Sequence, residues 1–471
     1  MSIFDSETIG LSWFDVQNKN DISNKIKSLL SLADKYPVNN TKPKAIIVPH
    51  ASYYYSGLCA SIAYNSLKKF AYDINRIIIL GTLHNDYQGL FVPEENYIYD
   101  INIDYETINK LKIFKYNNSP FLPEHSIRIQ IPFIQYIFSF DIKIIPILVG
   151  NLDNFGNFAD QLKTIDDEKT LWVISTDFSH VNGHFHHKID TNGIYHNIFK
   201  HDRSLIQTLL ENKKPKFDNT MSVCGINAIK LWSSMNLEVI GRLGCYYTSI
   251  NNWNNLLENI KNISPDVNIV SYASIIYTKK NTSQNLENLF SRFEELLLLR
   301  FVRQIVQYTL LDEINELILP FKSPNMNLKL GVFVTIKKND DLRGCIGIIT
   351  TEDILYNNIP KYALQTAFND PRFNPVKKDE LSQLKYSITI LSRDKIELKN
   401  LDLNKWRLGS DAIILENPKG HAIFLPQVPI EFNWNKKTTL EHLSLKASNN
   451  KYLYLEKDTK LFILPGYEFF E

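Results

Sequence analysis

The sequence predicts two domains, an α/β domain at the N-terminal end followed by a smaller α+β domain. The chain has 471 residues, more than one hydrophobic core normally supports, and 44% of them are hydrophobic, including 27 Phe and 24 Tyr. Short apolar runs alternate with longer amphipathic runs up to about Thr278, after which the pattern becomes less regular. These observations predict a parallel sheet covered by helices in the first domain and a different architecture in the second.

The first domain is predicted over residues 1–280. Fully apolar runs predict buried strands, and spacings of three and four residues between apolar positions predict helices that pack on the sheet. The predicted strands are Ala45–Val48, Ile77–Leu80, Ile144–Val149, Leu171–Ser175 and Val267–Tyr272. The predicted helices are Gly57–Phe70, Ser126–Ser139 and Ile226–Met235.

The second domain is predicted over residues 287–471. A polar stretch, Lys279–Gln284, interrupts the apolar pattern and predicts a short linker, and a helix over Leu286–Leu311 then opens the domain. The predicted strands are Leu330–Ile336, Ile346–Ile349, Tyr386–Leu391, Ala412–Glu416 and Ala422–Leu425. The predicted helices are Ile354–Phe368 and Leu440–Ala447.

Composition excludes several classes of protein. A formal net charge of +1 does not indicate a nucleic-acid binder. The sequence shows neither a secretory signal nor an apolar stretch long enough to span a membrane, so a cytoplasmic protein is expected. The cysteines lack paired zinc spacing, which predicts reduced thiols, with Cys59 and Cys245 in the core.

Three predicted strands end close to imidazole side chains. His50 follows the first strand, His84 follows the second, and Asp177 and His180 follow the strand Leu171–Ser175. Ligands bind at the carboxyl ends of parallel strands, so these side chains are expected to meet in one crevice. Cys224 precedes a predicted helix, whose N-terminus stabilises a thiolate.

Two imidazoles and a thiolate form a soft ligand set suited to iron, copper or zinc. The sequence therefore predicts a transition-metal site made by His50, His84 and Cys224, with Asp177 and His180 as acid/base or supporting groups. A single His after a strand is more often a hydrogen-bonded structural residue, but three such positions and a cysteine favour a site. The cluster His184, His186 and His187 fits a solvated loop better.

Five segments in this order resemble the Memo family over nearly all of residues 1–280: Pro49–Tyr53 (PHASY), Leu80–His84 (LGTLH), Glu124–Ser126 (EHS), Ser175–His180 (STDFSH) and Ser222–Gly225 (SVCG). The resemblance implies a fold like that of class III extradiol dioxygenases and the same metal set, His50, His84 and Cys224. Ser52, Asn85 and Arg128 depart from the family pattern, and Arg128 reverses a charge beside the EHS segment.

Four segments of the second domain resemble the AMMECR family over residues 287–471: Leu342–Gly347 (LRGCIG), Asp370–Phe373 (DPRF), Leu425–Pro429 (LPQVP) and Leu440–Ala447 (LEHLSLKA). The hexapeptide LRGCIG is expected just before a strand, and it gives Arg343 and Cys345 as a candidate catalytic site. A packed turn with a buried cysteine explains the hexapeptide equally well. His421 or His442 is a conceivable base for Cys345, and Ser444 replaces a cysteine common in relatives.

The two resemblances imply parts B and A of a three-part prokaryotic system, AmmeMemoRadiSam, whose third member is a radical SAM protein. The leading hypothesis is a metal-dependent enzyme or enzyme component, with redox chemistry as one of its options, that works with such a partner on an unknown small molecule. One alternative is a non-catalytic module that binds phosphopeptides or proteins. Another is an extradiol-type dioxygenase, which a cysteine ligand makes less expected because thiolate is soft and oxidisable.

Overall fold

The computed structural model describes residues 10–38, 40–94, 101–138, 142–190, 194–217, 222–251, 253–254, 256, 263–280, 285–313 and 321–471, with the side chains of 194–196 excepted. The chain forms two compact units, Met1–Thr282 with Phe290–Glu294, and Ser283–Leu289 with Glu295–Glu471. The linker residues Asn281–Gln284 of the prediction lie outside the described residues. Among the described residues, no helix combines the length and apolar character needed to cross a membrane.

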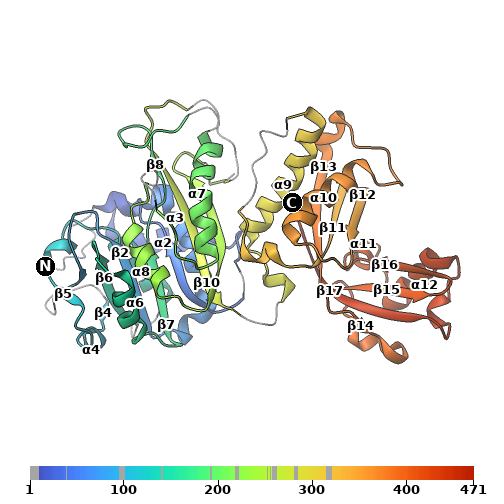
Figure 1. Ribbon diagram of the computed structural model, residues 1–471, viewed down its shortest axis with the longest axis horizontal. Helices are drawn as coiled ribbons and strands as arrows, with labels where there is room; N and C mark the ends of the chain where they lie inside the picture. The colour runs from blue at the N-terminus through green and yellow to red at the C-terminus, as the bar shows by residue number, and fades with distance from the viewer. Residues whose placement is uncertain are drawn as a thin grey trace. The chain divides into compact units, whose positions relative to one another are not determined.

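The first unit is built on a mixed sheet (Figure 1), whose described strands run in the order β5-β3-β6-β2-β7-β1-β10-β8. Its central strands are mutually parallel: β6 (Lys143–Val149), β2 (Arg76–Thr82), β7 (Thr170–Ser175) and β1 (Pro43–Val48). Nearly every residue of these strands is buried, because helices cover both faces. Four predicted strands are thus confirmed.

The smaller strands complete this sheet at its margins. β3 (Leu90–Val92) pairs antiparallel with β6 and parallel with β5 (Phe114–Tyr116), and β4 (Asn102–Ile103) pairs with β6. β8 (His180–Val181) pairs antiparallel with β10.

The expectation of a wholly parallel sheet is wrong on one side of β1. The predicted strand Val267–Tyr272 is part of β10 (Ile269–Lys279), which runs antiparallel to β1 and to β9 (Val239–Thr248). β9 connects to β10 without a crossover helix among the described residues, so the two strands run in opposite directions.

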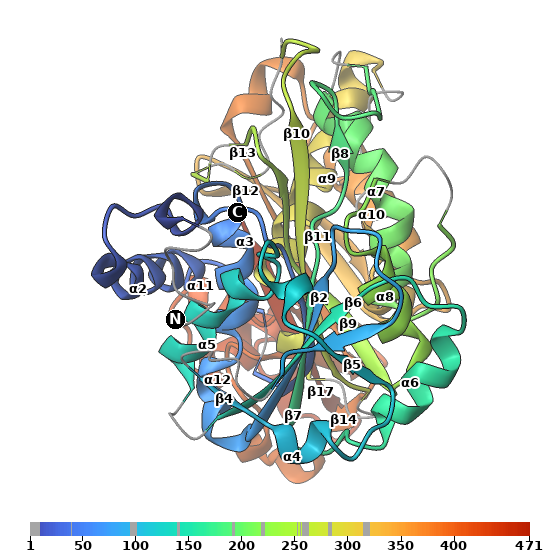
Figure 2. The same ribbon diagram turned by 90° about the vertical axis from the view of Figure 1, so that its left-hand side faces the viewer.

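Helices lie on both faces of the sheet, as Figure 2 shows. α2 (Ile22–Ala33), α3 (Tyr53–Asn65) and α5 (Ile131–Ile137) pack on one face, and α6 (Phe155–Lys163), α7 (Ile194–Leu210) and α8 (Ile226–Ser234) pack on the other. A one-turn helix, α4 (Tyr105–Ile108), follows β4.

Two helices have bounds that differ from those predicted: α3 is displaced toward the N-terminus, and α5 is shorter. α3 begins at Tyr53 and ends at Asn65, and a 3-10 helix, Lys68–Asp73, follows it. α5 is only seven residues long, with the 3-10 turn Arg128–Gln130 before it and Pro132 in its first turn.

The second unit contains an antiparallel sheet whose described strands run in the order β12-β11-β13-β17-β15-β16. Their bounds are β11 (Gly331–Lys338), β12 (Asp341–Ile348), β13 (Leu384–Leu391), β15 (Asp411–Asn417), β16 (Gly420–Phe424) and β17 (Lys460–Phe470), and β14 (Ile396–Glu397) pairs with β17. The last strand, β17, bridges the sheet, because its first half pairs with β15 and its second half with β13. The strands and helices segregate as expected for an α+β unit.

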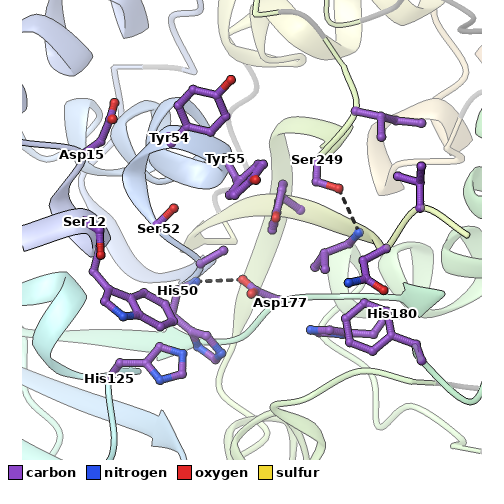
Figure 3. A pocket seen from close by; sticks show the side chains of 18 of the residues that line it. Ser12, Asp15, His50, Ser52, Tyr54, Tyr55, His125, Asp177, His180 and Ser249 are labelled. Atoms are coloured by element: carbon purple, nitrogen blue, oxygen red, sulfur yellow. Dashed lines mark hydrogen bonds between the residues drawn. The ribbon is translucent and has the colours of Figure 1, made fainter. Parts of the chain in front are cut away.

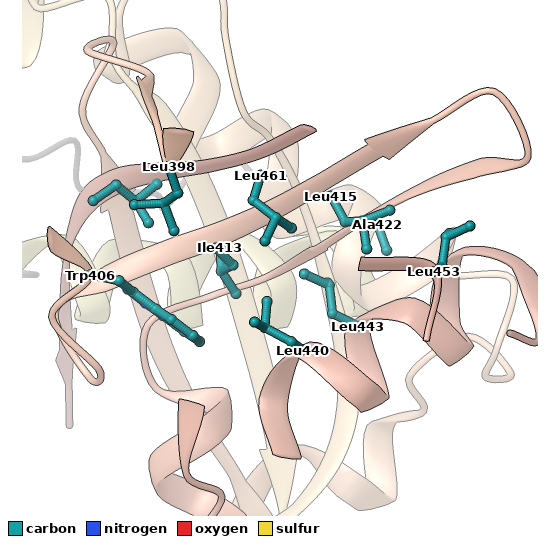
Figure 4. Packing of buried hydrophobic residues seen from close by; sticks show 10 residues of the cluster. Leu398, Trp406, Ile413, Leu415, Ala422, Leu440, Leu443, Leu453 and Leu461 are labelled. Atoms are coloured by element: carbon teal, nitrogen blue, oxygen red, sulfur yellow. The ribbon is translucent and has the colours of Figure 1, made fainter. Parts of the chain in front are cut away.

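The helices of this unit are α9 (Arg292–Leu311), α10 (Leu355–Phe368), α11 (Val428–Glu431) and α12 (Lys436–Ser448). α10 packs on β11 and β12, whereas α12 packs on β16 and β15. Trp406, Leu440 and Leu443 fill the space between α12 and the sheet, as Figure 4 shows.

Two predictions for this half of the chain were wrong in detail. The helix predicted from Leu286 starts instead at Arg292, because Ser291 and Glu294 form a capping box: the Ser291 hydroxyl accepts from the Glu294 backbone N–H, and the Glu294 carboxylate accepts from that of Ser291. The hexapeptide expected before a strand lies within β12.

Candidate metal centre

The predicted side chains at the strand ends do meet at one edge of the first sheet. β1 ends at Val48 just before His50, β2 ends at Thr82 before His84, and β7 ends at Ser175 before Asp177. These three strands are parallel neighbours in the order β2-β7-β1, so their carboxyl ends share an edge.

The ring of His50 is buried, and its protonation is fixed by its neighbours. Its Nδ1 lies 3.1 Å from the Ser175 hydroxyl, which donates its only proton to the Ser126 carbonyl at 2.7 Å and accepts from the Gln130 amide at 3.1 Å. Nδ1 must therefore carry the proton of this hydrogen bond. The ring then faces the sulfur of Cys224, 3.2 Å away, with Nε2, whose proton a bound metal ion would replace.

His84 and His180 are oriented in the same way. The Nδ1 of His84 lies 3.0 and 3.1 Å from the two carboxylate oxygens of Glu124, a buried residue. The Nδ1 of His180 lies 2.8 Å from the Phe178 carbonyl and 3.0 Å from the Ser222 carbonyl, and carbonyls only accept. In both rings Nδ1 is the donor, so Nε2 is the atom that faces the site, and at His84, whose pKa is raised to about 10, a metal ion would replace the Nε2 proton.

Cys224 is a partly buried thiol two residues before α8. Burial acts to raise its pKa, but the charge and hydrogen bond of His50, together with a hydrogen bond from His84, outweigh burial and lower the pKa to about 6. The sulfur also accepts a hydrogen bond from the backbone N–H of Asp177 at 3.2 Å. This thiol is therefore largely a thiolate at neutral pH, the form that binds metals.

The acidic groups next to these rings behave differently from one another. The buried carboxylate of Asp177 accepts a hydrogen bond from the His50 backbone N–H at 2.8 Å, and burial raises its pKa although His180 opposes the shift. Burial also acts to raise the pKa of Glu124, but its bond with His84 dominates and lowers it. The pKa of His84 rises correspondingly to about 10, against the effect of burial, through Cys224 and Glu124.

His125 is a functional candidate that the sequence reasoning did not assign. Its ring is stacked on His84 with centroids 5.0 Å apart, lies 5.3 Å from His50, and is covered by Trp13 at 4.1 Å. Burial, with the charge of His50, lowers its pKa to about 3, so the ring is neutral at pH 7. The EHS segment belongs to the resemblance to the family, but no predicted strand ends at it, so His125 could not be assigned from strand ends.

Two groups of potential ligand atoms, each within 4.8 Å of one another, share His50. One is His50, His84 and His125, and the other is His50, Asp177 and Cys224. Nitrogen and sulfur donors of this kind suit iron, copper or zinc. The three predicted ligands are thus divided between two groups that share His50: His84 is grouped with His125, and Cys224 with Asp177.

The site opens into a cavity of about 1080 Å³, shown in Figure 3. His50, His84, His125, Asp177 and His180 form part of its lining, whereas Cys224 lies behind the lining, with its sulfur 3.2 Å from Nε2 of His50. A volume of this size accommodates a small organic ligand.

Two departures from the family pattern can be placed next to this pocket. Arg128 is buried and donates to the carbonyls of Phe121 and Leu122 at 2.7 and 3.1 Å, and, after burial and the charge of His50, its charge contributes to the lowered pKa of His125 in the lining. Ser52 lines the cavity at the start of α3. The predicted core cysteines Cys59 and Cys245 are fully buried.

The predicted loop histidines remain outside both groups. Among the described residues, His184, His186 and His187 belong to neither set of potential ligands. His184 and His186 are exposed, as the loop prediction expected.

The second candidate site, at Arg343 and Cys345, is tied into the packing of its domain. Arg343 donates twice to Glu380, from Nε and Nη2 at 3.0 Å each. The backbone N–H of Cys345 donates to Asp370 at 2.9 Å, and Arg372 donates to the Cys345 carbonyl at 3.0 Å. These contacts join β12 to the segment after α10.

The thiol of Cys345 has an environment unlike that of Cys224. Burial raises its pKa, and it accepts a hydrogen bond from Thr335 at 3.3 Å. Within residues 321–471, the Cys345 thiol bonds to Thr335, and its backbone bonds to Asp370 and Arg372. None of these partners is His421 or His442, and His442 stacks instead on Trp434 at 4.0 Å.

The glycines of the hexapeptide also have packing roles. A Cβ at Gly344 would lie 2.7 Å from the carbonyl oxygen of Thr366 in α10, and one at Gly347 would lie 2.1 Å from that of Val332. Glycine is needed where backbones approach this closely.

Comparisons with known proteins agree with these two regions. A family model described as Memo-like protein matches residues 10–275, and one described as AMMECR1 matches residues 299–466. A protein of Nanoarchaeum equitans is 35% identical over 178 residues, which cover 37% of this chain and 98% of the relative. A protein of Methanocella arvoryzae is 38% identical over 146 residues, covering 30% of this chain and 73% of the relative. The crystal structure of an uncharacterized protein from Pyrococcus horikoshii is 29% identical, covers 38% of this chain and 91% of that chain, and has a TM-score of 0.35.

Proposed function

Because the chain belongs to the Memo-like protein family and joins a Memo-like domain to a C-terminal AMMECR1 domain, we propose that it is a metal-dependent, redox-active enzyme or enzyme component. The first domain, over residues 1–280, holds iron or copper, with zinc as a further candidate. The ligands are His50, His84 and Cys224.

One observation carries this proposal. Nδ1 of His50 donates to Ser175 and Nδ1 of His84 donates to Glu124, so that Nε2 of each ring faces the Cys224 sulfur as the ligand atom. Outer partners of this kind fix the tautomer and orientation of metal-binding histidines. A thiol with a lowered pKa adds the soft donor that iron and copper prefer.

When bound, the ion would supply Lewis acidity or electron exchange. The residues around it would bind the substrate and transfer protons. His180, whose Nδ1 is held by two carbonyls, presents Nε2 as a proton acceptor in the pocket, and the raised pKa of Asp177 favours proton transfer at its carboxylate.

The AMMECR1 domain, over residues 287–471, would supply substrate or partner recognition, with Arg343 and Cys345 as its candidate site. A radical SAM protein is the expected partner, because the two families resemble two parts of a system that includes one. Joining both domains in one chain raises the concentration of each near the other.

An extradiol-type dioxygenase is a weaker candidate, although the family resemblance implies that fold. A thiolate next to His50 is oxidisable, which does not favour ring cleavage by oxygen. Oxygen uptake with a panel of catechols and added ferrous iron would test this activity.

The phosphopeptide-binding module remains the non-catalytic alternative. Among the described residues that line the pocket there is neither a lysine nor an arginine, although phosphate recognition usually depends on such cations. Peptide binding that survives removal of the metal would favour this alternative.

Metal analysis of the full-length chain tests the proposal. The wild type should carry about one transition-metal ion, as a three-ligand site predicts. Cys224→Ser and His50→Ala should lose it, and Cys345→Ser, a matched thiol outside the site, should retain it. A wild type without transition metal, or a Cys224→Ser chain with the wild-type content, would overturn the proposal.

A further inference from the structure

The lining of the pocket combines the candidate ligands with several aromatic rings. Figure 3 draws Asp15, Tyr54 and Tyr55 on the side of the cavity away from His125. These three residues, with Trp13 and Phe185, also belong to the lining, and we call the five of them the outer wall. Four of the five are aromatic, and two of these rings reach the site: Trp13 lies 4.1 Å from His125 and Phe185 lies 5.2 Å from His180, between ring centroids.

Two rings of the outer wall are unusually exposed for large aromatic side chains. Tyr54 is 64% exposed and Tyr55 is 45% exposed, and their rings meet edge to face with centroids 4.9 Å apart. α3 begins at Tyr53, which is buried, so the helix turns the next two side chains outward. Exposed aromatic rings that border a cavity offer contact surface to a flat ligand.

The outer wall also lacks the cations that an anionic ligand needs. Neither lysine nor arginine is found among the described lining residues, the carboxylates there are Asp15 and Asp177, and the positive charge of His84 is already paired with Glu124. Asp15 is ion-paired with Lys25, which does not itself line the cavity. A doubly charged phosphate would meet aromatic faces and carboxylates here, whereas a cation would meet favourable ring faces.

The other polar groups of the lining are neutral hydroxyls and amides. Ser249 accepts a hydrogen bond from the Val270 backbone N–H at 3.1 Å, and the Asn268 side chain accepts one from the His184 backbone N–H at 2.8 Å. Such groups orient an uncharged ligand without selecting a charge.

Building on the proposed function of the candidate ligands, we infer that the outer wall binds an aromatic group that is uncharged or positively charged, and that it discriminates against phosphorylated ligands. The ligand would place this ring between Trp13 and the two exposed tyrosines. Its opposite end would reach the candidate metal ligands.

Three matched probes test the inference: 2-phenylethanol, 2-phenylethylamine and 2-phenylethyl phosphate, which share one ring and differ in charge. Each is titrated by calorimetry into the full-length chain after removal of metal by chelation, so that binding does not depend on an ion. The alcohol and the amine should bind in the millimolar range, and the phosphate about tenfold more weakly or not at all. Tyr54→Ala should weaken binding of the alcohol and the amine about fivefold.

Tyr72→Ala is the matched control, because Tyr72 is 95% exposed and lies outside the lining. It should bind all three probes as the wild type does. Tightest binding of the phosphate, no measurable binding of the alcohol and the amine, or equal effects of Tyr54→Ala and Tyr72→Ala would each overturn the inference.

Metal content, measured before chelation, separates this inference from the proposed function. A chain that purifies without metal but binds the amine retains the inference and overturns the metal site. A chain that carries metal but binds the phosphate best retains the metal site and overturns the inference.

Discussion

Cys224 and Cys345 are both partly exposed thiols beside glycines, in segments that carry the resemblance to a family. Yet Cys224 lies against His50 and His84, which lower its pKa to about 6, whereas burial raises the pKa of Cys345, whose thiol faces a threonine hydroxyl. The comparison teaches that a cysteine motif predicts chemistry only together with the basic groups that the fold brings to it.

The polar residues around the two thiols differ in the same way. In the first domain, Ser175 and Glu124 hold imidazole rings so that a ligand atom is left over on each. In the second, Glu380 accepts from Nε and Nη2 of Arg343, and Asp370 accepts from Arg372. The hexapeptide of the second domain is therefore explained to a large extent by packing.

The largest expected effect tests that structural role. Arg343→Ala leaves the Glu380 carboxylate, only 10% exposed, without its bidentate partner but still paired with Lys338, so the cost should be about 3 kcal/mol of unfolding free energy, at the low end for a broken buried pair. Denaturant unfolding measures this loss, and the metal content of the folded protein should not change.

Arg393→Ala is the control for this prediction, because the Arg393–Glu352 pair is exposed and should contribute less than about 1 kcal/mol. An Arg343→Ala chain as stable as the wild type would contradict the structural role and return Arg343 to the list of functional candidates.

The meeting of His50, His84 and Asp177 could be predicted from sequence because each follows a buried apolar strand, and parallel strands share their carboxyl edge. His125 could not be found in this way. It lies between two 3-10 turns, Ser119–Phe121 and Arg128–Gln130, and reaches the site only because Glu124 binds the backbone and ring of His84.

The direction of the strands could also not be predicted from the apolar pattern of the sequence. The residues of β10 are as apolar as those of β1, and a buried strand reads the same whether its neighbour is parallel or antiparallel. The start of α9 was in principle readable, since Ser291 and Glu294 have the spacing of a capping box, but the apolar residues Leu286, Leu289 and Phe290 continued the helical pattern across it.

The second effect concerns the groups that hold the rings. Ser175→Ala removes the acceptor for Nδ1 of His50, so the ring is free to rotate and to shift its proton to Nε2. Metal affinity should fall about ten- to hundredfold, as loss of such outer partners usually causes. Competition with a chelator of known affinity measures it.

Ser233→Ala removes another buried hydroxyl, one that bonds within α8 to Ile229, and should leave the affinity unchanged. Equal affinity for Ser175→Ala and the wild type would mean that His50 does not depend on Ser175 for its tautomer.

The smallest effect compares the two thiols directly, in the chain stripped of metal. At pH 6 about half of Cys224 should be thiolate, whereas Cys345 should be almost entirely protonated because its pKa is raised. A thiolate of low pKa is a weaker nucleophile, which offsets part of this difference, so Cys224 should be alkylated by iodoacetamide at least about tenfold faster. Peptide-resolved mass spectrometry gives both rates, and the fully buried Cys59 is an internal control.

The pH profile of this reaction has a definite sign. Because the pKa of Cys224 is lowered to about 6, its alkylation should slow as pH falls below 6 and reach a plateau above pH 7. The rate for Cys345 should still be rising at pH 8, because its pKa is raised. A Cys224 rate that rises in parallel with that of Cys345 between pH 7 and 8 would show that the imidazoles do not activate this thiol, and the contrast between the two sites would then rest on metal binding alone.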